Sequence, residues 1–241
     1  MKGIIVSLVI ASLLGIFVLF AIMQDYLAYD PLIAADVRIA NLFFTFRSLS
    51  GVKTFYAITT LASPTVSIAV IGFLAAIFFW RKQWMSGLIG IVGFVGSEGV
   101  TALFKIVFHR TRPDLMLRAI TEDSYSFPSG HATTAAFLFG YIGYLAFLRF
   151  RSTVSRVLII CLVAIGILLI DFSRLYLGVH FVSDVLAGNA IGLLGLFVTI
   201  VIDQWRMERR KLIVHPLPAT AIGGAVIVLL LAASLVFVSN K

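Results

Sequence analysis

The strongest constraint on the fold of this chain is a series of apolar runs, each about 20 residues long. Seven such runs lie at about 3–23, 56–80, 84–108, 132–149, 155–172, 184–204 and 218–238. A helix of about 20 residues crosses the hydrocarbon core of a bilayer. Since lipid offers no hydrogen-bond partners, the backbone must satisfy its own polar groups there. The runs therefore predict an all-α, polytopic transmembrane helical bundle, with six core helices and a seventh at the C-terminal end.

The composition argues against a water-soluble domain. Of the 241 residues, 61% are hydrophobic and only 12% are charged, whereas soluble domains carry about 25% charged residues. No linker divides the chain, so we expect a single domain over 1–241. The first apolar run is too long for a signal peptide, and we expect it to be retained as a transmembrane helix. Cys161 lies within an apolar run, and we expect it to be buried in the core.

Basic residues predict which ends of the helices face the cytoplasm. The connectors 81–83, 149–156 and 206–211 are short and basic, which is typical of cytoplasmic segments. With the N-terminus inside, ten of the 19 basic residues fall inside and nine outside. Because most of the outer nine belong to one polar cluster, we place that cluster on the outer face. The net charge of +8 then reflects topology and lipid contact, and no nucleic-acid partner is expected.

The segment 24–52 is amphipathic rather than membrane-spanning. Asp30 and Pro31 are typical of a helix start. The residues that follow mix apolar side chains with Asp36 and Arg38. Two interpretations fit equally well: a helix that lies in the outer membrane interface, and a loop helix that packs on the bundle.

Three short polar stretches stand out among the apolar runs. The first, 105–113, ends the third run, and the second, 128–131, precedes the fourth. The third stretch, 173–184, lies between the fifth and sixth runs. With alternating helix directions, all three reach the same membrane surface. The sequence therefore predicts one polar site built from three distant segments.

The residue types in these stretches are suited to a phosphate group. Lys105, Arg112 and Arg174 supply three cations, and arginine offers a planar fork that matches phosphate oxygens. Lys105 and Arg112 are two helical turns apart, so one helix face would present both if the helix continues. Ser129 and Gly130 precede a predicted helix, whose free N–H groups can bind an anion.

Two histidines and an aspartate add the groups for phosphoryl transfer. His180 and Asp184 are four residues apart, which on a helix places them on one face. The carboxylate would then orient the imidazole and leave its other nitrogen free to attack. His131 comes from a different segment, from which it can protonate the leaving oxygen and later activate water.

These stretches resemble the phosphatidic acid phosphatase type 2 (PAP2) superfamily, which also contains bacterial acid phosphatases and vanadium haloperoxidases. The pattern of the family is K-x6-RP, then PSGH, then SR-x5-H-x3-D. This sequence matches every motif position, at Lys105, Arg112, Pro113, Pro128, Ser129, Gly130, His131, Ser173, Arg174, His180 and Asp184. The motif core, 105–184, covers about a third of the chain, and the apolar runs around it are similar to the membrane-embedded branch of the family.

The resemblance implies a role for each motif residue. His180 would be the nucleophile that forms a phosphohistidine, Asp184 its partner, and His131 the general acid and then the general base. Family members need no metal ion, and the sequence has no acidic cluster of the kind that Mg²⁺ requires. No cofactor is therefore expected. The phosphate would be bound by Lys105, Arg112, Ser129, Gly130 and Arg174.

Members of the membrane branch act on lipid phosphates, so the resemblance implies a membrane lipid phosphatase. Its substrate would be phosphatidic acid, phosphatidylglycerol phosphate or undecaprenyl diphosphate. We expect it in a bacterial cytoplasmic (inner) membrane, among membrane lipids, with the site facing the periplasm or outside; the oligomeric state is not readable from the sequence. Two alternatives stay open: a phospholipid carrier or scramblase that uses the site for binding only, and a vanadate-dependent peroxidase.

Five further polar residues each allow more than one role. His109, Arg110 and Arg118 could contact a second phosphate or be interface charges. Glu98 could pair with the lysine of the first motif or with a deeper polar group. Asp171 could orient the arginine of the third motif or cap a helix connection.

Overall fold

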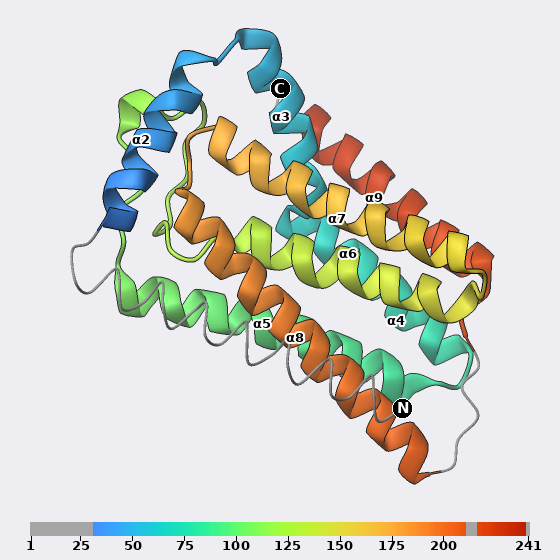
Figure 1. Ribbon diagram of the computed structural model, residues 1–241. Coiled ribbons are helices and arrows are strands. Elements are labelled where there is room, and N and C mark those ends of the chain that lie inside the picture. Colours follow the sequence, from blue (N-terminus) through green and yellow to red (C-terminus); the bar gives the residue numbers. More distant parts are fainter. Residues whose placement is uncertain (1–30, 211–215, 240–241) are drawn as a thin grey trace.

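The computed structural model describes residues 31–210 and 216–239, which form helices and the segments that connect them (Figure 1). The predicted first span, 3–23, and Asp30 lie outside the described residues. The helices are α2 (Pro31–Thr45), α3 (Leu49–Thr59), η1 (Thr60–Ala62), α4 (Pro64–Trp80), α5 (Trp84–Phe108), η2 (Leu115–Leu117), α6 (Gly130–Arg149), α7 (Thr153–Tyr176), α8 (Val182–Arg209) and α9 (Ala219–Ser239).

The predicted all-α transmembrane architecture is confirmed. Within the described part, six stretches are long and apolar enough to cross a membrane. The prediction was least accurate for the second span, which begins at Leu49 instead of residue 56 and contains a break. The break arises because Ser63 accepts the N–H of Val66 and Pro64 occupies the first helical position, so α4 starts anew there.

Helix α6 is the centre of the bundle, and α7 lies at its periphery (Figure 1). In the most apolar 18-residue stretch of α6, 67% is buried, whereas in that of α7 only 6% is buried. Phe137 of α6 is fully buried, and its ring lies 5.6 Å from the Phe94 ring of α5. The neighbouring helices therefore enclose most of α6, including its start at the site.

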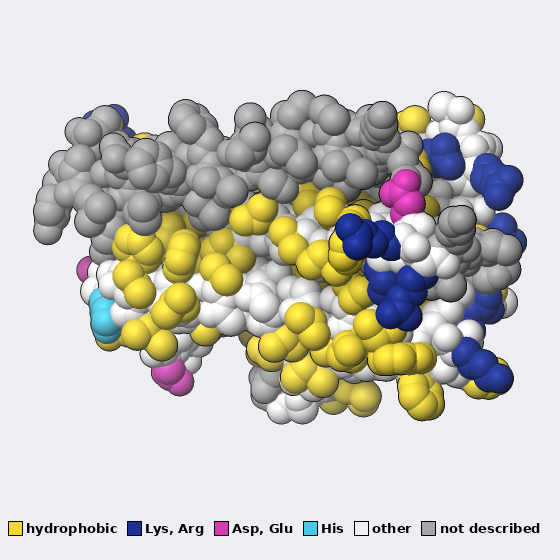
Figure 2. Space-filling view, turned by 90° about the horizontal axis from the view of Figure 1, so that it is seen from below, with side chains coloured by type: hydrophobic (Ala, Val, Ile, Leu, Met, Phe, Trp, Pro, Cys, Tyr) yellow, Lys and Arg dark blue, Asp and Glu magenta, His cyan; other side chains and the backbone are white. Residues whose placement is uncertain are grey.

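The outer surface of the bundle is apolar, as the bilayer requires. Figure 2 shows hydrophobic side chains over much of one face and basic side chains gathered at one end. On α7 the exposed residues include Leu158, Leu162 and Leu168. Cys161 of the same helix is also exposed, so the expectation that it lies in the core was wrong. An apolar run contains both core and lipid-facing residues, and composition alone does not separate them.

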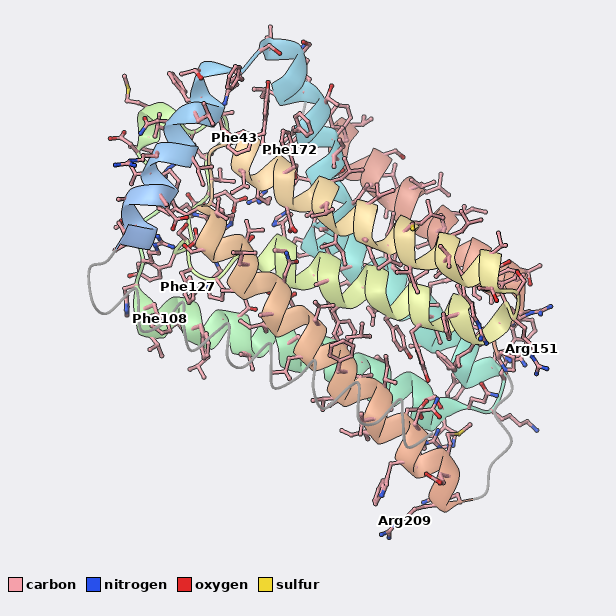
Figure 3. All side chains as sticks on the ribbon, viewed as in Figure 1. Phe43, Phe108, Phe127, Arg151, Phe172 and Arg209 are labelled. Carbon is pink, nitrogen blue, oxygen red and sulfur yellow. The ribbon has the colours of Figure 1, made fainter. Side chains whose placement is uncertain are left out.

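The two ends of the bundle differ in chemistry. Arg151 and Arg209 lie at one end, while Phe108 and Phe127 lie at the other (Figure 3). The first end carries the basic connectors between α4 and α5, between α6 and α7, and after α8. The second end, here called the site end, carries the three polar stretches at the ends of α5, α6, α7 and α8. The basic connectors and the polar motifs therefore lie at opposite ends of the bundle.

Close packing of α8 on α6 sets the position of the site end. A Cβ atom on Gly188 would lie 2.4 Å from the Ser129 carbonyl, and one on Gly192 would lie 2.4 Å from the Thr133 carbonyl. Small residues that let two backbones approach are typical of membrane helix interfaces. The two glycines therefore fix the distance between the helices that carry the second and third motifs.

We expect Gly192→Ala to lower the free energy of unfolding by about 1–3 kcal/mol, because the Thr133 backbone cannot yield to the new methyl group. Thermal unfolding in detergent measures the change. Gly99→Ala is the matched control, since a Cβ there meets nothing within 4 Å. Equal unfolding temperatures for the two variants would contradict the proposed close contact.

Candidate active site

The three polar stretches meet at the site end. The loop 109–129 connects α5 to α6 and is anchored by the Phe127 ring, which lies 5.1 Å from the Phe108 ring (Figure 3). This contact holds the loop on the end of α5. The backbone N–H of Ser129 donates to the Asp184 carbonyl at 2.9 Å, which joins the second motif to the third. The predicted convergence is thus present in the fold.

His180 is held between a carboxylate and a guanidinium. Its Nδ1 lies 3.4 Å from Asp184 Oδ2, and its Nε2 lies 3.1 Å from Arg112 Nη1. Burial lowers the pKa of His180 to about 3, with the charges of Arg174 and Arg112 acting in the same direction and Asp184 opposing them. The imidazole is therefore neutral at physiological pH, as a nucleophile must be.

The pairing of His180 with Asp184 was predicted, but not its geometry. His180 precedes α8, which begins at Val182, so the two residues do not share a helix face. A turn at Gly178, with a φ of 71°, sends the chain from α7 to His180. A Cβ on Gly178 would lie 2.0 Å from the Leu117 carbonyl, so glycine is required there. Turn geometry, rather than helical spacing, positions the imidazole.

Arg112 also reaches the site by another route than the one predicted. Helix α5 ends at Phe108, and His109 has a left-handed φ of 47°, so Lys105 and Arg112 do not lie on one helix face. Instead, Arg112 is fixed by the loop: its Nε donates to the Ser124 carbonyl at 2.7 Å. Its Nη1 donates to the Val179 carbonyl at 2.7 Å, beside His180.

The other two cations enter from the flanking helices. Arg174 is 1% exposed, and its Nη1 donates to Thr59 Oγ1 at 3.1 Å. Lys105 donates to the Tyr125 carbonyl and interacts electrostatically with Arg112 and Arg174. Lys105, Arg112 and Arg174 are called the cation cluster below. Their convergence from α5, the loop and α7 gives the positive potential that a phosphate dianion needs.

The second motif forms the start of α6. Ser129 is the N-cap and is fully buried, with its side chain accepting from the Ala132 N–H at 3.5 Å. Gly130 is the first helical residue, and His131 lies in the first turn. His131 and Arg174 line one cavity of about 910 Å³. A helix N-terminus beside cations is a favourable setting for an anion.

Arg110 has a role that the sequence did not indicate. Its Nη1 lies 2.6 Å from Asp184 Oδ1, and its Nη2 lies 2.8 Å from Asp36 Oδ2. Arg110 is 7% exposed, so it is neither an interface charge nor free for a second phosphate. Asp36 also accepts from the Ser183 N–H at 3.2 Å. Because Asp36 is buried, the described part of 24–52 packs on the bundle as α2, as one of the two interpretations of that segment predicted.

Two other polar residues form hydrogen bonds within the bundle. Glu98 accepts from the Thr134 hydroxyl at 2.8 Å, which connects α5 to α6. Asp171 accepts from the Asn189 amide at 2.6 Å, which connects α7 to α8. Both residues therefore act as polar contacts between helices.

The remaining two of these polar residues, His109 and Arg118, lie in the loop 109–129. The His109 ring packs on the Tyr125 ring with a centroid distance of 4.6 Å. Arg118 Nε donates to the Pro113 carbonyl at 2.7 Å. These contacts stabilise the loop that carries Arg112.

Glu122 and Ser126 are site residues that the sequence did not reveal. Ser126 donates to Asp184 Oδ2 at 2.5 Å and helps to hold the carboxylate in place. Glu122 Oε1 lies 2.5 Å from Arg174 Nη2. Burial would raise the pKa of Glu122, but the charges of Arg174 and Arg112 outweigh it and lower the pKa. Neither residue belongs to a motif, and only the folded loop brings them to the site.

The chain is similar in sequence to known proteins. The model of the PAP2 superfamily matches residues 86–208. Phosphatidylglycerophosphatase B of Bacillus subtilis is 33% identical over 195 residues, which are 79% of this chain and 94% of that protein. Decaprenylphosphoryl-5-phosphoribose phosphatase of Mycobacterium tuberculosis is 32% identical over 118 residues, which are 46% of this chain and 56% of that protein.

Two solved structures have a similar fold. The transmembrane PAP2 type phosphatidylglycerolphosphate phosphatase from Bacillus subtilis has a TM-score of 0.69 and 30% identity, over 82% of this chain and 96% of that one. LpxE of Aquifex aeolicus has a TM-score of 0.51 and 21% identity, over 69% of this chain and 95% of that one. The second likeness concerns the fold alone.

We expect Asp36→Ala to lower the free energy of unfolding by about 3 kcal/mol, because it leaves part of the buried Arg110 guanidinium without its anion. Unfolding in detergent measures the loss. Asp203→Ala is the control, since its ion pair with Arg206 is partly exposed and should contribute less than about 1 kcal/mol. A loss no larger for Asp36→Ala than for the control would show that α2 is not held by this pair.

Proposed function

This chain belongs to the PAP2 superfamily, and from that premise we propose that it removes phosphate from a membrane lipid through a histidine nucleophile, without a metal ion. It is a multi-pass membrane protein and a lipid phosphatase. The observation that carries the mechanism is the environment of His180. Its Nδ1 faces Asp184, and its Nε2 faces the guanidinium of Arg112. A neutral, oriented imidazole beside a cation cluster is suited to attack on phosphorus.

The proposed reaction has two steps. In the first, His180 Nε2 attacks phosphorus, the bond from phosphorus to the lipid oxygen breaks, and His131 gives that oxygen a proton. In the second, His131 takes a proton from water, the water oxygen attacks phosphorus, and the bond to His180 breaks. Inorganic phosphate leaves, and both histidines regain their starting states. The cation cluster, with the Ser129 and Gly130 end of α6, stabilises the charge on the phosphoryl oxygens in both steps.

Phosphatidylglycerol phosphate is the first lipid that we propose as substrate. The relative named phosphatidylglycerophosphatase B aligns over 94% of its own length, which supports this choice over phosphatidic acid or undecaprenyl diphosphate. Further cations near the site would favour a diphosphate. Of the three residues considered for it, Arg110 is already paired with Asp36 and Asp184. We further propose that the site end faces the outside of a bacterial cytoplasmic membrane, as the basic connectors at the opposite end support.

The protein purified in detergent is expected to release phosphate from lipid in the presence of EDTA. His180→Ala should reduce release by at least about 1,000-fold, since the nucleophile is lost. A panel of phosphatidylglycerol phosphate, phosphatidic acid and undecaprenyl diphosphate ranks the substrates. His109→Asn is the matched control, because it removes an exposed histidine of the same end and asparagine tolerates a left-handed φ.

Each alternative gives a different result in this assay. Lipid binding without phosphate release would indicate a carrier or scramblase. Halide oxidation after addition of vanadate would indicate a peroxidase, whereas a phosphatase should only be inhibited. Activity that EDTA abolishes, or that survives in His180→Ala, would contradict the histidine mechanism.

The pH dependence of kcat/KM is expected to be bell-shaped. Because burial lowers the pKa of His180 to about 3, the nucleophile becomes charged and inactive only as the pH falls toward that value. The rate should also fall at high pH, where His131 has no proton to give. Initial rates from about pH 2 to pH 9 cover both limbs, since the fall on the acid side is centred near the His180 pKa of about 3. His131→Gln should remove the fall at high pH. A monotonic profile for the wild-type protein would contradict the paired-histidine scheme.

A further inference from the structure

One carboxylate of the site is paired with two members of the cation cluster and lines a cavity. Glu122 Oε1 lies 2.5 Å from Arg174 Nη2, and Oε2 lies 3.6 Å from Arg112 Nη2. Glu122 lines the cavity of about 910 Å³ together with His131 and Arg174. The carboxylate is therefore paired with two of the three cations and borders the same cavity as one of them, Arg174.

This carboxylate uses donors that suit a phosphate. A carboxylate that spans two guanidinium groups has the geometry of two phosphoryl oxygens on the same groups. Arg174 is held in place by Thr59, and its Nε is buried without a hydrogen-bond partner among the described residues. Further donor capacity is thus present beside Glu122. A phosphate dianion and the Glu122 carboxylate cannot share these donors closely, because two like charges in a buried site repel.

The position of Glu122 allows it to move aside. The Glu122 side chain is 26% exposed, whereas Asp184, the other carboxylate of the site, is 0% exposed. Glu122 lies on the loop between η2 and α6, and its neighbours Thr121 and Asp123 are exposed. The adjoining cavity offers room for the side chain to rotate away from the arginines.

We propose that Glu122 is an internal competitor of phosphate at the cation cluster. It occupies Arg174 and Arg112 in the substrate-free protein, moves into the cavity when a lipid phosphate binds, and returns to help displace inorganic phosphate. The proposal rests on the proposed function, since it assumes that the cation cluster is the phosphate site. Competition of this kind weakens the apparent affinity for phosphate by the fraction of molecules in which the site is open.

The test is the affinity of the purified protein for inorganic phosphate, measured by calorimetry in detergent without turnover. Glu122→Gln keeps the size of the side chain and removes its charge. If the site is open in about a tenth of molecules, this variant should bind phosphate about 10-fold more tightly than the wild type. Asp123→Asn is the matched control, because it removes the same charge from the next residue of the loop and should change the affinity less than about 2-fold.

A purely structural role for Glu122 predicts a change of phosphate affinity in the opposite direction. If Glu122 is needed to hold Arg174 in place, Glu122→Gln should bind phosphate more weakly. Weaker or unchanged binding would overturn the proposal. So would equal tightening in Asp123→Asn, which would indicate a long-range charge effect. Glu122→Ala provides a second test should the glutamine variant unfold, and it is expected to tighten binding as well.

The experiments distinguish a failure of the Glu122 proposal from a failure of the proposed phosphatase function. Tighter phosphate binding by Glu122→Gln would support the competitor even if no lipid on the panel released phosphate. Release from a lipid with unchanged binding would support the phosphatase and overturn the competitor. If neither the wild type nor the variants bound phosphate, the cation cluster would not be a phosphate site, and the proposal would fall with it.

Discussion

The burial of the Asp184 carboxylate is the constraint on which the site end depends. A buried carboxylate is costly unless several donors compensate it. Asp184 is 0% exposed and lies within hydrogen-bond distance of Arg110, Ser126 and the Phe181 N–H. These donors come from the loop 109–129 and from the start of α8. The need to satisfy one charge therefore joins these two segments, which also meet through the apolar packing of Phe127 and Ala187.

The same requirement extends outward to α2. Asp184 pairs with one terminal nitrogen of the Arg110 guanidinium, and Asp36 pairs with the other at 2.8 Å. Asp36 in turn accepts from the Ser183 N–H and so caps the start of α8. A chain of alternating charges thus runs from α2 to His180. Each charged group in this chain is compensated in the protein interior by the group next to it. The removal of one group therefore leaves a neighbouring buried charge without its partner.

Most of the fold could be predicted from the sequence, because a bilayer permits few solutions for a long apolar run. The motif residues were also found, since polar groups are conspicuous among apolar ones. The contacts of Asp36, Glu122 and Ser126 could not be found in this way. Asp36 and Ser183, for example, are 147 residues apart and belong to no shared pattern. The predictions of shared helix faces failed where a turn interrupts the helix. The left-handed His109 ends α5 before Arg112, and α8 starts only after His180.

The two carboxylates nearest the cation cluster differ in how firmly they are held, and this difference separates their duties. Asp184 is enclosed by donors from two segments, so its displacement would leave several buried groups unpaired at once. Among the described residues, the Glu122 carboxylate pairs with two arginines that a phosphate would equally satisfy, and it borders a cavity. Exchange of Glu122 for phosphate therefore conserves the pairing of the arginines, whereas exchange of Asp184 would not. A site built in this way keeps the His180 imidazole oriented by Asp184 while the anion on the arginines changes.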